Sequence, residues 1–223
     1  MMYAVHEHIS RGSEISEYLR EDMEERFQIS CRQIQRMMEK NGEEIWAGLK
    51  RAIRGVSEKV LFLQNSGEKA PIGYLAFHFL KSGIVMDEVS LCIEAMDDSF
   101  YLDRQTVSAL YIPDFLQEIY REDIAFLKQK AAHRFIRIQS HELAETKQNW
   151  GNFYNAVLFR MTEALAGMIW QEVAESGVRI TERFKILYGG YMDLATVVYG
   201  KEYADGILPD GRGARKPYPI RYQ

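Results

Sequence analysis

The spacing of apolar residues changes character twice along the chain and predicts its main elements. In residues 13–56 apolar positions recur every three or four residues, which predicts a helix with Ser13 as its cap. Residues 59–96 contain three apolar runs separated by the turn-forming stretches SGEKAP and KSG, a pattern typical of antiparallel strands. The helical period returns near Asp103 and continues to about residue 200. The expected fold class is α+β, predominantly helical, with a three-stranded antiparallel meander (about 59–96) packed against long helices.

The pattern leaves the helix boundaries open at two places. Basic and apolar residues lie on opposite sides of residues 32–54, and this phase continues past Asn41–Gly42. One helix therefore passes through that pair, or two helices meet there with matching faces. Farther along, the pattern fits one long helix or two helices broken near Trp150–Gly151, followed by a short helix within residues 180–199.

The predicted third strand has one apolar face and one polar face. Its apolar set is Val89, Leu91, Ile93 and Ala95, and its polar set is Glu88, Ser90, Cys92 and Glu94. The second strand, IGYLAFHFL, is apolar on both faces, so we expect it to be central in the sheet. We expect the third strand to be an exposed edge, with room for a small site or a partner on its polar face.

Composition fits a single domain over residues 1–223, with an N-terminal helical segment (1–57), the meander, a helical part (103–200) and an extended tail (205–223). Apolar residues make up 47% of the chain and charged residues 27%, which excludes global disorder. The net charge of −4 gives the whole molecule no electrostatic reason to bind nucleic acid or anionic lipid.

The chain carries no pattern for export or for a membrane span. Its N-terminus lacks the features of a signal peptide, and no run reaches the roughly 18 apolar residues of a membrane helix. We therefore expect a soluble, cytoplasmic protein. The two cysteines, Cys31 and Cys92, have neither metal-binding nor disulfide spacing, so no metal is predicted and the cofactor, if any, is unknown.

His78, in the predicted central strand, is the first candidate catalytic residue. A two-residue turn at Ser82–Gly83 would place it opposite Asp87, and a three-residue loop would place it opposite Met86. In the first register His78, oriented by Asp87 and with Tyr74 on the same face, suits a general base or a polar ligand. The alternative is a core histidine satisfied by a backbone group.

A second candidate is the polar segment QSHELAETKQN, which interrupts the apolar pattern. His141 and Glu145 stand one helical turn apart, and His133 precedes them, so the three form a candidate ligand-binding set. No spacing typical of a metal site accompanies them. The alternative is a solvated helix face.

The segment ERFQISCRQIQRMMEK resembles the turn and recognition helix of bacterial winged-helix repressors. The resemblance covers about sixteen residues and lies in Phe27, Ile29, Ser30, Ile34 and Arg36. It implies a degenerate helix-turn-helix at 14–40 whose Arg32, Gln33 and Arg36 contact nucleic acid. A plain amphipathic helix explains the same pattern.

Taken together, the sequence predicts a cytosolic binding or protein-interaction domain that is non-catalytic and self-associating. An edge strand and apolar residues at seven-residue spacing both favour a homodimer. A small molecule or another protein is the expected partner, and neither nucleic acid nor a membrane is expected. Two alternatives stay open: a small-molecule enzyme with a His/Asp or His/Glu acid-base pair, and a DNA-binding regulator.

Overall fold

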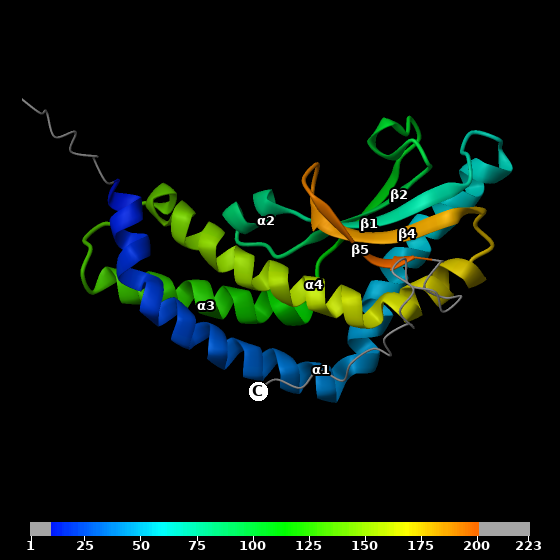
Figure 1. Cartoon of the computed structure of the whole chain (residues 1–223). Coiled ribbons are helices and arrows are strands. Elements are labelled where there is room, and N and C mark those ends of the chain that lie inside the picture. Colours follow the sequence, from blue (N-terminus) through cyan, green and yellow to red (C-terminus); the bar gives the residue numbers. More distant parts are fainter. Residues whose placement is uncertain (1–9, 201–223) are drawn as a thin grey trace, which may run out of the picture. The chain divides into compact units, whose positions relative to one another are not determined.

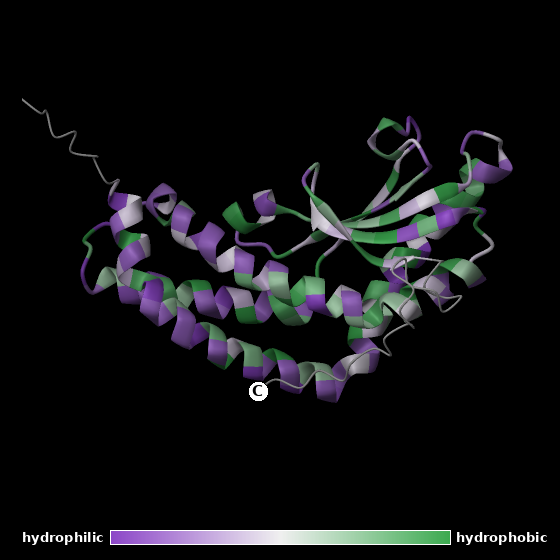
Figure 2. Cartoon of the chain, in the orientation of Figure 1, coloured by the Kyte–Doolittle hydropathy of each residue, from purple (hydrophilic) through white to green (hydrophobic). Residues whose placement is uncertain are grey.

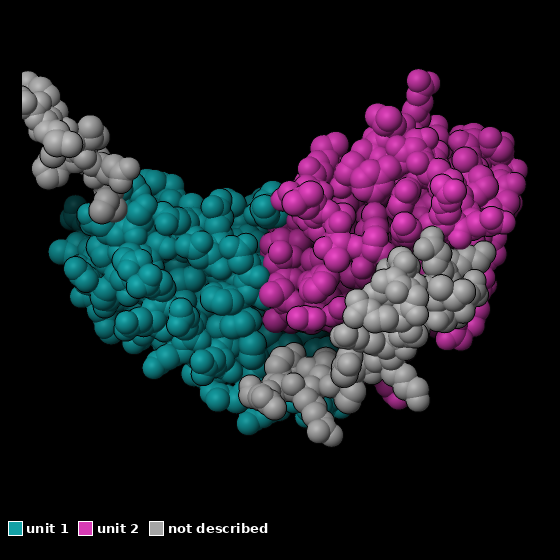
Figure 3. Space-filling view, viewed as in Figure 1, with its two compact units in different colours: residues 1–42, 81–89, 114–154 teal, residues 43–80, 90–113, 155–223 magenta. Residues whose placement is uncertain are grey.

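The computed structural model describes residues 10–200 and shows a mixed α+β protein. Two compact units divide the chain (Figure 3), and each is described by itself. Unit 1 contains residues 1–42, 81–89 and 114–154, and unit 2 contains residues 43–80, 90–113 and 155–223. The predicted tail at 205–223 and the first nine residues lie outside the described residues. No helix of the described part has a stretch both long and apolar enough to cross a membrane.

Unit 1 is helical. It contains the first part of α1 (Arg11–Asn65), all of α2 (Lys81–Val85) and α3 (Asp114–Ala132), and the first turns of α4 (Ala144–Glu175). The α3 helix buries an uninterrupted stripe at helical spacing: Leu116, Ile119, Tyr120, Asp123, Ile124, Leu127 and Ala131. One member of this apolar stripe is an aspartate, and its partners hold unit 1 together.

The break between α3 and α4 lies at residues 133–143, which include the short η2 helix (Ser140–Leu143), and not at Trp150–Gly151 as one expectation placed it. Gly151 has a packing role instead, because a Cβ there would lie 2.8 Å from Cγ1 of Ile84. The absence of a side chain lets α4 approach α2 closely.

The α1 helix is longer than its pattern predicted. Ser10, and not Ser13, is its cap, since Oγ of Ser10 accepts a hydrogen bond of 3.1 Å from the Ser13 amide. Asn41 departs from helical geometry, with φ −119° and ψ 22°, so the helix continues through the Asn41–Gly42 pair with a kink. The strand predicted at residues 59–65 is wrong, because the buried positions Val56, Val60 and Gln64 continue the helical spacing.

Unit 2 is built on a five-stranded mixed sheet (Figure 1). The strands are β1 (Ile72–Phe79), β2 (Leu91–Met96), β3 (Val107–Tyr111), β4 (Ile180–Gly190) and β5 (Ala195–Gly200), in the order β3-β2-β1-β4-β5. The prediction that the IGYLAFHFL strand is central is confirmed. The prediction that the LCIEAM strand is an edge is wrong, because β3 pairs with it and takes the edge position.

Two segments predicted to be helical belong to this sheet. Residues 107–111 pair antiparallel with β2, and residues 180–200 supply β4, parallel to β1, and its hairpin partner β5. A three-stranded antiparallel meander is therefore present, but its strands are β1, β2 and β3 and not the three that were predicted. Strands β4 and β5 extend the sheet beyond it. Gly189 allows the tight β4–β5 turn, because a Cβ there would lie 2.4 Å from the Leu194 carbonyl oxygen.

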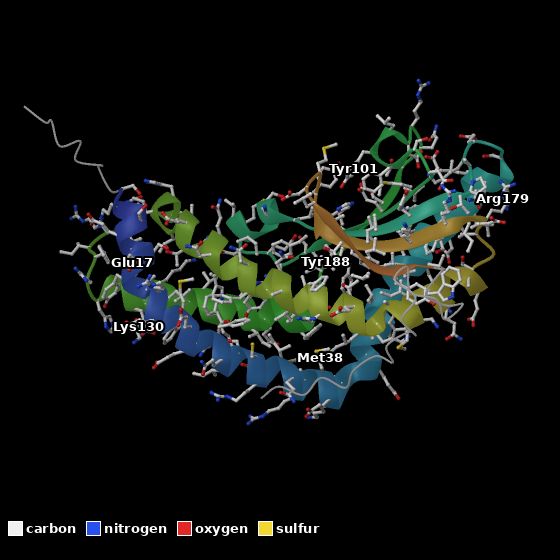
Figure 4. The ribbon with its side chains drawn as sticks, viewed as in Figure 1. Glu17, Met38, Tyr101, Lys130, Arg179 and Tyr188 are labelled. Carbon is white, nitrogen blue, oxygen red and sulfur yellow. The ribbon has the colours of Figure 1, made fainter. Side chains whose placement is uncertain are left out.

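The inner face of the sheet packs on α4, and the outer face carries the short η1 helix (Phe100–Leu102). On the inner face, the Tyr188 hydroxyl donates to Oδ1 of Asn155 in α4 at 2.8 Å, and its ring packs 5.4 Å from the ring of Phe159. The outer face carries a small apolar cluster of Ala76, Met96 and Leu187, covered by side chains that include Tyr101. Figure 4 labels Tyr101 and Tyr188 on these opposite sides, and Figure 2 shows the hydrophobic residues along the central strands.

Candidate functional site

His78 lies on the outer face of β1, opposite Cys92 of β2 and Gly189 of β4. Both predicted hairpin registers are wrong, because the connection between the strands is longer than either loop. It contains α2, and the β1–β2 pairing resumes only where the Leu80 amide donates to the Ser90 carbonyl. The register that forms places Glu94, two residues along β2, on the face that His78 occupies.

The imidazole of His78 is completely buried and has one hydrogen-bonded nitrogen. Nδ1 lies 3.3 Å from the Gly190 carbonyl oxygen. Nε2 lies 3.1 Å from Oε2 of Glu94, at an angle that forms no hydrogen bond. Glu94 is itself buried. One interpretation of the sequence was a core histidine satisfied by a backbone group. This holds for Nδ1 of His78 but not for Nε2.

Two tyrosines complete this arrangement from segments outside β1 and β2. Tyr101 comes from the η1 helix (Phe100–Leu102), with its ring 6.0 Å from the imidazole, and Tyr191 from the β4–β5 turn lies edge-on to it at 5.6 Å. Burial raises the pKa of the Tyr101 hydroxyl, and the nearby charge of Glu94 raises it further. A contact with the Met192 amide lowers the pKa but does not outweigh burial. Yet the Tyr101 hydroxyl is buried without a well-aligned hydrogen-bond partner among the described residues. We call His78, Glu94, Tyr101 and Tyr191 the His78 cluster.

Cys92 borders the His78 cluster. Burial, with the nearby charge of Glu94 as the second cause, raises the pKa of the Cys92 thiol to about 11. The thiol is therefore protonated at neutral pH and is a poor nucleophile.

Tyr74 and Asp87, predicted to act with His78, have other neighbours. Tyr74 lies on the outer face four residues before His78, where its ring packs edge-to-face at 5.1 Å against Phe100. Asp87 belongs to unit 1, where it has a left-handed backbone (φ 60°) and pairs with Lys147 at 2.7 Å. A catalytic role for His78, Asp87 and Tyr74 stays a prediction; the carboxylate recorded beside His78 is that of Glu94.

The predicted set of His133, His141 and Glu145 lies at the surface of unit 1. Glu145 accepts a hydrogen bond of 2.7 Å from the Ser13 hydroxyl, and His141 is in η2. Within residues 10–200 no three His, Cys, Asp or Glu side chains gather closely enough to hold a metal ion. Ligand binding by this set stays a prediction.

Arg32, Gln33 and Arg36 lie within α1, and no turn interrupts the helix between residues 25 and 40. The helix-turn-helix interpretation is therefore wrong for this segment. Ser30, expected to cap a recognition helix, is buried and donates to Asp123 at 2.8 Å. A nucleic-acid role for the three residues stays a prediction that rests on their polarity alone.

The second site in unit 2 is a groove beside the edge strand. Its volume is about 550 Å³, and it is lined by Glu58, Lys59, Phe62 and Leu63 of α1 and by residues 106–108 at the start of β3. The Phe62 side chain is 72% exposed. We call this the β3 groove.

Comparison of the chain with protein-family models, with curated proteins and with solved structures finds no match. Sequence reasoning had placed Glu94 on the polar face of its strand but did not pair it with His78, since that needs the register. It missed Tyr101 and Phe62 as site residues. The available signal was the seven-residue spacing of Val56 and Leu63, which continues the helix and leaves Phe62 exposed. The strand prediction for that segment concealed it.

Proposed function

We propose that this protein is a binding domain that takes up an extended peptide segment as an added strand along β3. The observation that supports the proposal is an edge strand, β3, which pairs on one side only among the described residues and lies next to a groove of about 550 Å³. Small-molecule and side-chain pockets in proteins span roughly 300–1,000 Å³, so the β3 groove has room for side chains of a bound segment.

The sequence of β3 supports this use. Edge strands expose unpaired N–H and C=O groups, and natural proteins protect them with charges, prolines or bulges. The β3 sequence VSALY has neither a charge nor a proline, and its register with β2 runs without a shift. Leu110 on the outer face of β3 is 54% exposed, and Phe62 flanks the groove. Backbone pairing would supply affinity, and the two apolar side chains would select the segment.

Replacing Phe62 with serine should weaken binding of an extended peptide by roughly ten-fold or more, because burying a phenylalanine side chain is worth about 1.5–3 kcal/mol. The probe is a peptide selected from a random phage-displayed library on the full chain, with affinity measured by fluorescence polarisation. Peptide binding should also slow amide hydrogen exchange in Val107–Tyr111.

The matched control is Arg51→Ser, an exposed residue of α1 outside the groove lining. Both substitutions change exposed side chains and should leave stability within about 0.5 kcal/mol of the wild type. Peptides that bind both variants equally well, or that leave exchange in β3 unchanged, would refute the proposed groove.

Self-association, expected from the sequence, would use the same edge if a second copy supplies the added strand. We then expect a dimer mass in native mass spectrometry, and a monomer for Leu110→Glu, because a charge on an edge strand opposes pairing. A dimer that persists in Leu110→Glu would place self-association elsewhere on the chain.

A further inference from the structure

The His78 cluster places two buried hydrogen-bond acceptors next to each other. A carbonyl oxygen only accepts, so the contact between Nδ1 and the Gly190 oxygen at 3.3 Å requires the proton on Nδ1. In the neutral ring Nε2 then carries a lone pair. That lone pair lies 3.1 Å from Oε2 of Glu94, which is also an acceptor. Two buried acceptors side by side need a donor between them.

The side chains around this pair meet that need only in part, because the Cys92 thiol is a weak donor to Glu94 and no described side chain forms a well-aligned hydrogen bond with Nε2 of His78. The ion pair that the structure records for Glu94 is with His78 itself, which is charged only when Nε2 is protonated. The Tyr101 hydroxyl is buried, its contact with the Met192 amide is poorly aligned, and its ring lies 6.0 Å from the imidazole. A buried carboxylate and two polar atoms without well-aligned partners are costly unless a ligand satisfies them.

The aromatic rings indicate the charge of that ligand. Tyr101 and Tyr191 flank the imidazole, and Phe100 packs 4.2 Å from the Tyr101 ring. Ring faces attract cations, and the carboxylate of Glu94 adds a negative charge beside these rings. The side-chain donors here, the Tyr101 hydroxyl and the Cys92 thiol, are neutral and carry no charge that would attract an anion.

We propose that the His78 cluster binds a primary ammonium group. An ammonium group has three N–H donors, one each for Nε2 of His78, Oε2 of Glu94 and the Tyr101 oxygen, and its charge balances the carboxylate. This site is separate from the β3 groove and does not depend on it. A free amine and the end of a lysine side chain share this chemistry.

The segments over the cluster provide a route to it. Tyr191 is 51% exposed and its neighbour Met192 has a left-handed backbone, with φ 53°. Phe100, next to Tyr101, is also left-handed at φ 56°. Bulky residues in this conformation are uncommon and concentrate in segments around ligands. Entry past Tyr191 requires movement of the β4–β5 turn and leaves the strands in place.

The test measures thermal unfolding and calorimetric binding of the full chain with n-butylammonium chloride. Three further compounds are compared with n-butylammonium. The first, n-butanol, lacks the charge, and the second, tetramethylammonium, lacks N–H donors. The third, Nα-acetyl-lysine amide, represents a peptide source. We expect the melting temperature to rise with n-butylammonium and to stay unchanged with n-butanol at equal concentration. Tighter binding of the lysine amide than of n-butylammonium would identify a peptide as the source.

Glu94→Gln keeps the shape and removes the charge, so it should weaken n-butylammonium binding roughly ten-fold or more. Glu182→Gln, an exposed carboxylate of β4, is the control and should bind as the wild type does. Equal responses to the amine and to n-butanol, or no response to either, would overturn the proposal.

A measurement on the wild type covers the case in which Glu94→Gln does not fold. The ¹⁵N resonances of the His78 ring report whether Nε2 carries a proton in the amine-free protein at neutral pH. The proposal requires an unprotonated Nε2 whose resonance shifts when the amine binds. A protonated Nε2 in the free protein would mean that His78 already balances Glu94, and would overturn the ammonium site.

Discussion

Replacing Asp123 with alanine should lower the free energy of unfolding by about 3–5 kcal/mol, the range found when one partner of a buried ion pair is removed. Asp123 is completely buried in the apolar stripe of α3. Its carboxylate accepts hydrogen bonds from Nε of Arg26 at 2.5 Å, from the Ser30 hydroxyl at 2.8 Å and from the Tyr154 hydroxyl at 2.6 Å. It therefore joins α1, α3 and α4 within unit 1.

The large effect comes from the donors that the substitution leaves behind. Ser30 and Tyr154 are fully buried, and the Arg26 side chain is only 19% exposed. Burial, with the charge of Asp123 as the second cause, raises the pKa of Tyr154, so its hydroxyl keeps its proton and needs an acceptor. Alanine supplies none, and three desolvated donors lose their partner at once.

The neighbouring residue provides the control. Glu122 lies 3.7 Å from the Arg26 guanidinium but is half exposed, so Glu122→Ala should change stability by at most about 1 kcal/mol. Urea unfolding followed by circular dichroism measures both variants. Similar losses in the two variants would mean that the buried network contributes no more than an exposed ion pair.

The sequence predicted those parts of the fold in which one period governs a long segment. The helical period of α1 and α3 and the central position of β1 follow from apolar spacing alone. The segment VLFLQN was assigned to the wrong class because a short apolar run fits a buried helix and a strand equally well. Its continuation in phase with Val56 was the evidence for a helix.

The sites were harder to predict because they depend on long-range pairing. The neighbours of His78 follow from the β1–β2 register, and that register depends on the α2 helix between the two strands. This helix has only five residues, and its sequence KSGIV shows no helical period of its own. The Gly190 carbonyl comes from a strand more than 100 residues later, and β4 had been assigned to a helix. Alternation along β2 nevertheless predicted that Glu94 lies on its polar face.

Replacing Lys69 with methionine should lower the free energy of unfolding of unit 2 by about 3–5 kcal/mol. The Lys69 and Asp103 side chains are buried and form an ion pair, with Nζ 2.6 Å from Oδ2. Nζ also donates to the Gln105 carbonyl at 2.7 Å. Methionine keeps the volume of the aliphatic stem but leaves the buried carboxylate without its counter-charge. Lys59→Met, an exposed lysine of the same unit, should change stability by less than about 0.5 kcal/mol.

The pH dependence of stability tests the cause of this loss. Burial alone would raise the pKa of Asp103, but hydrogen bonds from Lys69 and from the amides of Asp97 and Gln105 outweigh burial and hold it below the usual value. In the wild type its contribution is therefore present above the unfolded pKa of about 3.9 and is lost as pH falls through the lower native pKa. In Lys69→Met the native pKa of Asp103 rises toward or above the unfolded value, so acidification should cost the variant less stability than it costs the wild type.

A double substitution that removes both charges separates the effect of charge from the effect of packing at the Lys69–Asp103 pair. Adding Asp103→Leu to Lys69→Met should recover part of the lost stability, because both buried charges are then gone. Recovery should be incomplete, since Oδ1 and Oδ2 of Asp103 also accept the Gln105 and Asp97 amides. These bonds hold the segment that carries Tyr101, so Lys69→Met should also weaken n-butylammonium binding at the His78 cluster. Unchanged amine affinity in a folded Lys69→Met protein would show that Tyr101 is positioned without Asp103.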